Sequence, residues 1–216
     1  IMKSIIIKKY DDENKAIKQA ALILKKTLKK GDIILTKPRL SNIKVKIMHF
    51  PSFIISKLSR GITHSCLYLG KGYILEIGAG INDSKIKKIK IEQLLKSKIG
   101  LFKGVTVYVV QPKYYKAKHR NLVFKFAINN FLKKSKVLAF SYWNMLKLWL
   151  RLILNKYKFS KKEGLNFKKD WNCSELIAYV LKRSGIKIGD RKTKFFLPSN
   201  FIFSKHFKTK KKITIK

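Results

Sequence analysis

The sequence predicts an α+β fold in which a small, mainly antiparallel sheet packs against a helix that begins near Cys173. Three observations predict it. The chain has 216 residues, of which 46% are hydrophobic, so it is long and apolar enough to bury a core. Short β-branched and aromatic runs bounded by glycine and proline alternate with segments of helical periodicity. The segment after Asn172 combines a cap, a single apolar face and a closing glycine. No repeat or domain boundary is visible, so residues 1–216 are expected to form one domain.

The N-terminal part is expected to contain one helix and one strand. Apolar residues recur at helical spacing over 11–30, an aspartate caps the segment, and Gly31 follows its last turn. The apolar run 32–36 predicts a strand that ends at Lys37-Pro38. The run 5–7 is either a short strand or a loose arm.

A hairpin in the middle of the chain decides which side chains share a face of the sheet. Strands predicted over 62–69 and 73–77 flank Gly70-Lys-Gly72. If these three residues form the loop, His64 is a diagonal neighbour of Glu76 on one face, whereas a two-residue loop would put the two on opposite faces. Glycine at the end of a three-residue loop suits its left-handed position, which favours the shared face.

The second half of the chain is expected to be more helical. Periodicity and turn signals predict strands over 86–91 and 104–110, helices over 114–134 and 137–157, and a basic tail after residue 203.

The helix after Asn172 places a thiol in its first turn. Asn172 is a good N-cap, and Glu175 stands at capping-box spacing from it. Gly185 ends the helix. Cys173 therefore lies among free backbone N–H groups at the positive end of the helix dipole, and both favour the nucleophilic thiolate. An inert buried cysteine on an ordinary helix is the alternative interpretation.

A thiol at a helix start, a histidine on a strand and a carboxylate beside it are the parts of a cysteine nucleophile system. Cys173 would attack, His64 would move the proton, and Glu76 would orient the imidazole. Alternatively, His64 is a satisfied strand histidine and Glu76 a solvated edge residue. Cys66 shares the His64 strand but lacks a helix dipole, and is a weaker candidate for the nucleophile.

Neither a metal nor another cofactor is expected. The two cysteines have no metal-ligand spacing and no disulfide framework. His49, His119 and His206 stand in basic or aromatic surroundings without ligand partners, and are interpreted as surface residues.

Four short motifs occur in a characteristic order along the chain: Gly31-Asp-Ile-Ile-Leu, Ile62-Thr-His-Ser-Cys-Leu-Tyr-Leu-Gly70, Gly72-Tyr-Ile-Leu-Glu76 and Asn172-Cys-Ser-Glu-Leu. They resemble the circularly permuted branch of the NlpC/P60 papain-like superfamily, in which the histidine strand precedes the cysteine helix. The turn Leu197-Pro-Ser-Asn-Phe201 is similar to the Pro-Ser-Asp segment of YiiX-like members. The order is also similar to the lecithin:retinol acyltransferase branch.

The resemblance implies a permuted papain-like fold with Cys173 as nucleophile, His64 as base and Glu76 as the orienting residue. Acyltransferase relatives usually carry a second histidine where this chain has Glu76, which favours the YiiX-like side. Asn200 replaces the usual aspartate of the turn. The segment at about 113–169 is longer than a minimal member needs and is interpreted as a helical insertion.

The expected function is that of a cysteine-dependent hydrolase or acyl transferase that forms an acyl-cysteine intermediate on an amide or ester, in a lipid or a peptide. The alternative is a catalytically inactive basic module that binds anionic membrane or nucleic acid. A cytoplasmic location, with or without peripheral membrane attachment, is expected because no signal peptide or membrane span is recognised.

The charge of the chain favours anionic partners. Lys and Arg number 51 against 11 Asp and Glu, a net charge of +40. The segment 137–157 carries Trp143 and Trp149, with Lys147 and Arg151 on a thin polar stripe, so it is either an interfacial helix or part of the core. Nonspecific contact with nucleic acid is a further option, although no nucleic-acid-binding motif is recognised.

Overall fold

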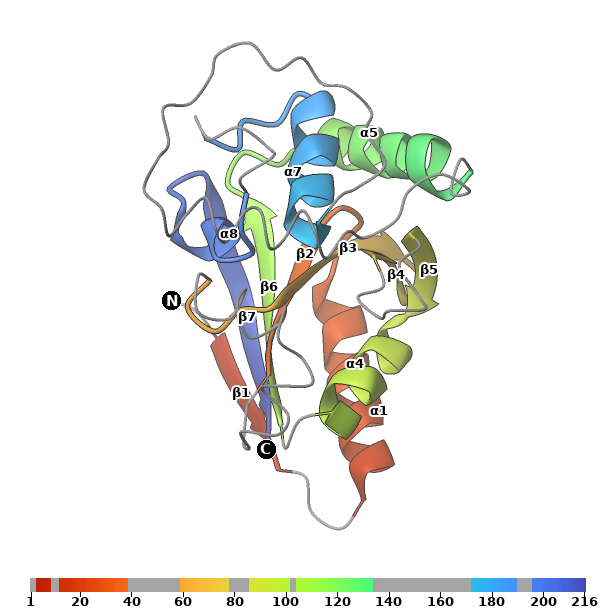
Figure 1. Ribbon diagram of the computed structural model, residues 1–216, viewed down its shortest axis with the longest axis vertical. Helices are drawn as coiled ribbons and strands as arrows, with labels where there is room; N and C mark the ends of the chain where they lie inside the picture. The colour runs from red at the N-terminus through yellow and green to blue at the C-terminus, as the bar shows by residue number, and fades with distance from the viewer. Residues whose placement is uncertain are drawn as a thin grey trace.

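A seven-stranded sheet organises the computed structural model, which describes residues 3–8, 12–38, 59–77, 86–101, 104–133, 172–189 and 196–216 (Figure 1). The strand order is β1-β7-β6-β2-β3-β4-β5, and every neighbouring pair is antiparallel except β1 and β7. The strands are β1 (Lys3–Ile7), β2 (Ile33–Pro38), β3 (His64–Gly70), β4 (Tyr73–Ile77), β5 (Ile86–Lys90), β6 (Val105–Pro112) and β7 (Phe207–Ile215).

Helices cover both faces of this sheet, which confirms the expected α+β class. The helices in the described ranges are α1 (Glu13–Thr27), α4 (Ile91–Leu101), α5 (Ala117–Ala127), the π-helical turn η1 (Ile128–Leu132), α7 (Cys173–Arg183) and the short α8 (Asn200–Phe203). One buried apolar cluster joins the sheet to α5, α7 and α8, and a second joins its other face to α1 and α4. Successive side chains of β2 point to opposite faces of the sheet, so Ile33 and Leu35 belong to the first cluster and Ile34 to the second.

Helix α1 follows the expected pattern closely. Asp12 is its N-cap, and its carboxylate accepts a hydrogen bond of 3.0 Å from the backbone N–H of Lys15. The expected apolar face is buried, namely Ala16, Ile17, Ala20, Ala21, Leu24 and, just after the helix, Leu28. Gly31 then reverses the chain into β2 with a φ of 78°.

The two ends of the chain contribute more strand than the sequence predicts. The run 5–7 is part of β1, which resolves the two interpretations given for it. The interpretation of the C-terminal segment as a basic tail was wrong, because β7 lies between β1 and β6 and pairs with both. The many lysines of this segment obscured the alternating pattern of a strand. Its apolar residues Phe207, Ile213 and Ile215 are buried in the core. The sheet is therefore larger than expected.

Several boundaries also differ from the prediction. Strands β2 and β6 both extend through a proline, since Pro38 pairs with Val105 and Pro112 with Phe207. In both cases the proline is the last residue of the strand, a position that tolerates the missing N–H. The strand predicted over 86–91 ends at Lys90, because Ile91 begins helix α4.

The hairpin between β3 and β4 has the predicted register, but its turn differs from the predicted one. Lys71 and Gly72 form a two-residue turn with positive φ values of 52° and 78°, and Gly70 pairs with Tyr73. The expected three-residue loop was therefore wrong. A bulge between Tyr68 and Gly70 takes up one extra residue and restores the register Leu67 opposite Leu75. The predicted shared face follows from the bulge.

Buried Asp32 links three distant parts of the fold. Its carboxylate accepts hydrogen bonds of 2.7 Å from Arg120 Nη1 on α5 and 2.7 Å from Lys210 Nζ on β7. The backbone N–H of Lys29, just after α1, donates to the same carboxylate at 2.9 Å. The side chain is completely buried, and both cations are largely covered. These contacts hold the start of β2 against the helix layer and the C-terminal strand.

Part of the sequence prediction lies outside the described residues. This holds for the helix expected over 137–157, for His49 and for most of the insertion expected at about 113–169, of which α5 and η1 are described. Among the helices of the described ranges, none combines the length and the apolar character needed to cross a membrane.

Candidate active site

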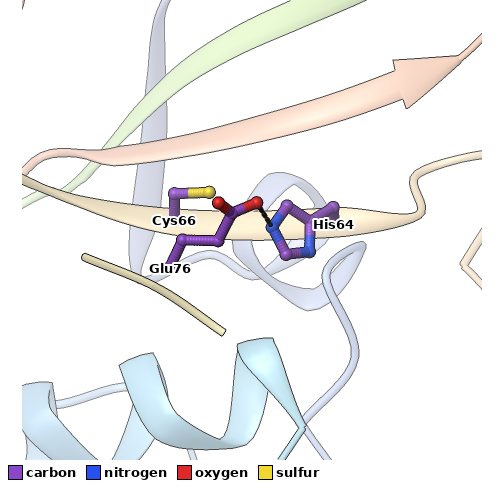
Figure 2. Close-up of side chains that lie close together, drawn as sticks. All are labelled: His64, Cys66 and Glu76. Atoms are coloured by element: carbon purple, nitrogen blue, oxygen red, sulfur yellow. Dashed lines mark hydrogen bonds and ion pairs between the residues drawn. The ribbon is translucent and has the colours of Figure 1, made fainter. Parts of the chain in front are cut away.

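A buried pair of His64 and Glu76 forms the centre of the candidate site. His64 begins β3, Glu76 lies in β4, and their side chains are in contact, with Nε2 and Oε1 2.9 Å apart. His64 is 4% exposed and Glu76 8%. Figure 2 shows the carboxylate facing Nε2 while the other ring nitrogen of His64 points away from it. The diagonal contact expected from the register is thus confirmed.

The surroundings of His64 and Glu76 shift the proton equilibria of both side chains toward the charged forms. Burial raises the pKa of Glu76, but the hydrogen bond and charge of His64, together with Lys98 and Lys87, outweigh it and leave this pKa below its usual value. Burial lowers the pKa of His64, but the nearby thiol groups of Cys66 and Cys173 raise it well above its usual value against the opposing charge of Lys98. A protonated His64 beside an ionised Glu76 is the favoured state.

Helix α7 delivers the third side chain. Asn172 caps it by accepting a hydrogen bond of 2.8 Å from the backbone N–H of Glu175, whose carboxylate accepts one of 3.2 Å from the backbone N–H of Asn172. The predicted capping box is therefore present. Cys173 is the first residue of the helix and is 4% exposed. The thiol lies at the positive end of the helix dipole.

The structure brings Cys173 to His64, and this contact changes the thiol. Burial raises the pKa of Cys173, but the charge of His64 and hydrogen bonding to His64 and Ser65 lower it to about 7. A large share of Cys173 is therefore thiolate at neutral pH. Cys173, His64 and Glu76 therefore lie close together, and their catalytic roles stay a prediction.

Ser65 is a part of the site that sequence reasoning missed. Its hydroxyl is buried and has no conventional hydrogen-bond partner among the described residues, and both its hydroxyl and its backbone act on the Cys173 thiol. A buried hydroxyl donor next to a thiolate lowers the energy of the negative charge. Its position directly after His64 in β3 gave no signal of this, because successive side chains of a strand face opposite sides of the sheet.

Cys66 is held in a different state. It is completely buried two residues after His64, and its pKa is raised by burial more than His64 lowers it. Cys66, His64 and Glu76 each offer one potential metal-ligand atom, and these atoms lie within 4.8 Å of one another (Figure 2). The absence of metal-ligand spacing between the two cysteines concerned the sequence alone, which could not show that Cys66, His64 and Glu76 lie together in the fold.

A turn from the C-terminal segment fastens the start of α7. The hydroxyl of Ser174 lies within hydrogen-bond distance of two acceptors, Asn172 Oδ1 at 2.9 Å and the backbone oxygen of Phe196, and shares its one proton between them. The backbone N–H of Ser199 donates to Ser59 Oγ at 2.7 Å. Asn200 closes the turn by accepting a hydrogen bond of 2.7 Å from the N–H of Leu197, so the asparagine supplies the acceptor oxygen that an aspartate would.

His119 and His206, the other histidines of the described ranges, lie outside this site. His119 lies in the first turn of α5, where its Nδ1 accepts a hydrogen bond of 3.3 Å from the backbone N–H of Lys116. His206 precedes β7, and its side chain is close to Gly189. Both are partly exposed, in line with the surface role expected for them.

Comparison of the sequence with protein-family models and with curated proteins finds no match.

Proposed function

We propose that the protein is a cysteine-dependent hydrolase or acyl transferase of permuted papain-like type, which acts on an amide or ester through an acyl-cysteine intermediate. Cys173 is the nucleophile, His64 the general base and acid, and Glu76 the residue that orients the imidazole. The observation that supports this most directly is the placement of His64 between a buried carboxylate and the thiol at the start of α7.

The proposed reaction has two half-reactions. Glu76 engages Nε2 of His64, so Nδ1 takes the proton of Cys173, and the reactive pair is a protonated His64 beside the Cys173 thiolate. The thiolate attacks the carbonyl carbon, a C–S bond forms, and the bond from that carbon to the leaving nitrogen or oxygen breaks as His64 returns the proton to the leaving group. Water or an acceptor alcohol or amine then attacks the acyl-cysteine while His64 takes its proton. The C–S bond breaks, and His64 passes that proton to the sulfur, which regenerates the free thiol.

The contrast between the two cysteines supports Cys173 as the nucleophile. Cys173 lies at a helix N-terminus with its pKa lowered to about 7, whereas burial keeps the pKa of Cys66 above its usual value. A thiolate is the reactive form, so only Cys173 is prepared for attack at neutral pH.

The net charge of +40 supports an anionic substrate or an anionic surface on which the substrate is presented. A lipid with an anionic head group and an amide or ester bond has both properties. The competing proposal, an inactive basic module that binds membrane or nucleic acid, needs no reactive thiol and is distinguished by the labelling experiment below.

Selective labelling of Cys173 tests the proposal. Wild-type protein is treated at neutral pH with a limiting amount of an alkylating or acylating probe, and the labelled peptides are quantified by mass spectrometry. We expect the Cys173 peptide to be labelled well before the Cys66 peptide, and a Cys66→Ala control to keep this reactivity.

Faster labelling of Cys66, or equally slow labelling of both thiols, would contradict the assignment of the nucleophile. In a second arm, turnover of activated ester and amide substrates is measured for wild type and Cys173→Ser. Turnover that survives in Cys173→Ser would show that another group performs the reaction.

A further inference from the structure

Cys66 gives the candidate site a second thiol that the proposed reaction does not use. Its side chain is fully buried beside His64 and Glu76, on the α1 and α4 side of the sheet. Figure 2 shows the sulfur of Cys66 and the carboxylate of Glu76 on the same side of β3 as the His64 ring. One atom from each of these three side chains lies within 4.8 Å of the other two.

The chemistry of these three groups suits one class of ion. Thiolate, imidazole and carboxylate are the usual ligands of Zn²⁺, at about 2.3 Å for sulfur and about 2.0–2.2 Å for nitrogen and oxygen. An ionised Cys66 and an ionised Glu76 would together carry two negative charges, which neutralise a divalent ion in a buried site. Mg²⁺ and Ca²⁺ are poor candidates because they require six or more oxygen ligands.

We propose that His64, Cys66 and Glu76 form a Zn²⁺ site, and that the bound ion holds the protein in an inactive state. Tetrahedral Zn²⁺ separates its ligand atoms by about 3.3–3.8 Å, given the metal–ligand distances above. Small side-chain rotations bring the three atoms from within 4.8 Å to this spacing. The fourth position is left to water.

Bound Zn²⁺ would block the proton transfer required of His64. Nε2 faces Glu76, so the ion replaces the proton that these two groups share. A neutral, metal-bound imidazole keeps its remaining proton on Nδ1, and this nitrogen can no longer accept the proton of Cys173. Binding releases the second proton of His64 and the thiol proton of Cys66 to solvent. The ion is not consumed, and a chelator reverses the inhibition.

Metal binding itself does not depend on the proposed function, whereas the inhibition rests on it. Direct binding is measured first, with Co²⁺ as a spectroscopic substitute for Zn²⁺. Wild-type protein should bind one Co²⁺ ion with a thiolate-to-cobalt charge-transfer band, and Zn²⁺ should displace it while Mg²⁺ should not.

Variants then assign the ligands. Cys66→Ala should abolish the charge-transfer band, and His64→Ala and Glu76→Gln should each weaken Co²⁺ binding at least about tenfold. Cys173→Ser should retain the band. Loss of the band in Cys173→Ser, or its survival in Cys66→Ala, would overturn the site.

A measurement on the wild type guards against variants that fail to fold. X-ray absorption of the Zn²⁺-loaded protein should show a single sulfur ligand with nitrogen and oxygen ligands completing the shell. A zinc coordination shell without sulfur, or the absence of zinc binding, would overturn the proposal.

The inhibitory consequence is measured as alkylation of Cys173 with and without Zn²⁺, each variant being compared with its own metal-free rate. Zn²⁺ should slow wild type and leave Cys66→Ala unaffected; equal slowing in both would overturn the inhibition. If Zn²⁺ binds as described but Cys173 is unreactive without metal, the proposed function fails and the metal site stands. If Cys173 is reactive and no metal binds, only the metal site fails.

Discussion

His64 is the residue on which the candidate site depends, because it contacts the carboxylate of Glu76 and interacts with the thiols of Cys66 and Cys173. The surrounding charges favour its protonated form, and that positive charge in turn favours the thiolate of Cys173. The proton is therefore shared by a coupled group of side chains whose titration belongs to the group as a whole.

The pH dependence of Cys173 alkylation tests this coupling. In wild type the rate should rise with a midpoint near 7, because the pKa of Cys173 is lowered to about 7 and only the thiolate reacts. Removal of the imidazole in His64→Ala leaves only Ser65 and the start of α7 to oppose burial, so the midpoint should rise by more than about one pH unit. Glu76→Gln removes the negative neighbour of His64, so the imidazolium is less stable and the midpoint should rise by a smaller amount.

Rates are measured by mass spectrometry of the Cys173 peptide across pH. The intrinsic reactivity of a thiolate falls with its pKa, so the midpoint is a safer readout than the rate at one pH. A larger shift in Glu76→Gln than in His64→Ala would reverse the roles given to these two residues.

At the scale of elements, helix α7 and the β3–β4 hairpin position the site. The capping box fixes where α7 begins, which places Cys173 in its first turn. The bulge beside Gly70 sets the register that brings Glu76 to His64. The capping box and the bulge are both local features of the chain, and the site requires both.

The cap of α7 offers a test at this scale. Asn172→Ala removes the acceptor for the N–H of Glu175 and for the hydroxyl of Ser174. We expect it to lower the free energy of unfolding by about 1 kcal/mol and to raise the midpoint of Cys173 alkylation, because the ordered helix start stabilises the thiolate. Urea unfolding and the pH profile measure the two effects.

Helix α1 provides a matched control. Asp12→Ala removes the cap of α1, which lies in the other layer of the fold, and should cost a similar free energy of unfolding without moving the Cys173 midpoint. A midpoint that shifts equally in both variants would mean that general destabilisation, and not the α7 cap, governs the thiol.

At the scale of the whole molecule, Asp32 ties the start of β2 to α5 and to the C-terminal strand β7. Asp32→Asn would leave Arg120 and Lys210 without their shared anion. We expect the free energy of unfolding to fall by about 3 kcal/mol, at the lower end for a buried pair because both cations retain some access to water. Glu92→Gln is the control, since it breaks the exposed pair with Lys25 and should cost no more than about 1 kcal/mol. Equal losses would show that the Asp32 network does not hold these elements together.

The positive charge of the whole chain leads to the remaining prediction. With a net charge of +40, the protein should bind vesicles that contain anionic lipid and detach as salt is raised, because charges are screened beyond about 8 Å at physiological ionic strength. Sedimentation with anionic and neutral vesicles at low and physiological salt measures this. Equal binding to both vesicle types would remove the electrostatic basis of the proposal. The apolar contribution expected from the helix at 137–157 concerns residues outside the described ranges.

Local signals in the sequence determined most elements that have a complete pattern. The cap and apolar face of α1, the capping box of α7 and the strands β3 and β4 each carry their information within one segment. The candidate roles of Cys173, His64 and Glu76 could be proposed from residue type and local setting, and the face shared by His64 and Glu76 from the hairpin register. The prediction missed β7, because its many lysines obscure the alternation of apolar and polar residues that is typical of a strand.

Only the tertiary structure decided what lies together across the chain. The contact of Cys173 with His64 joins segments separated by more than a hundred residues, and no periodicity carries that distance. The same holds for Ser65 beside the thiol, for Cys66 within reach of Glu76 and for Lys210 on Asp32. Burial and neighbouring charge set the chemistry of a thiol, and both are properties of the packed fold. The sequence by itself therefore determined which groups were available, and the fold decided which of them share a proton.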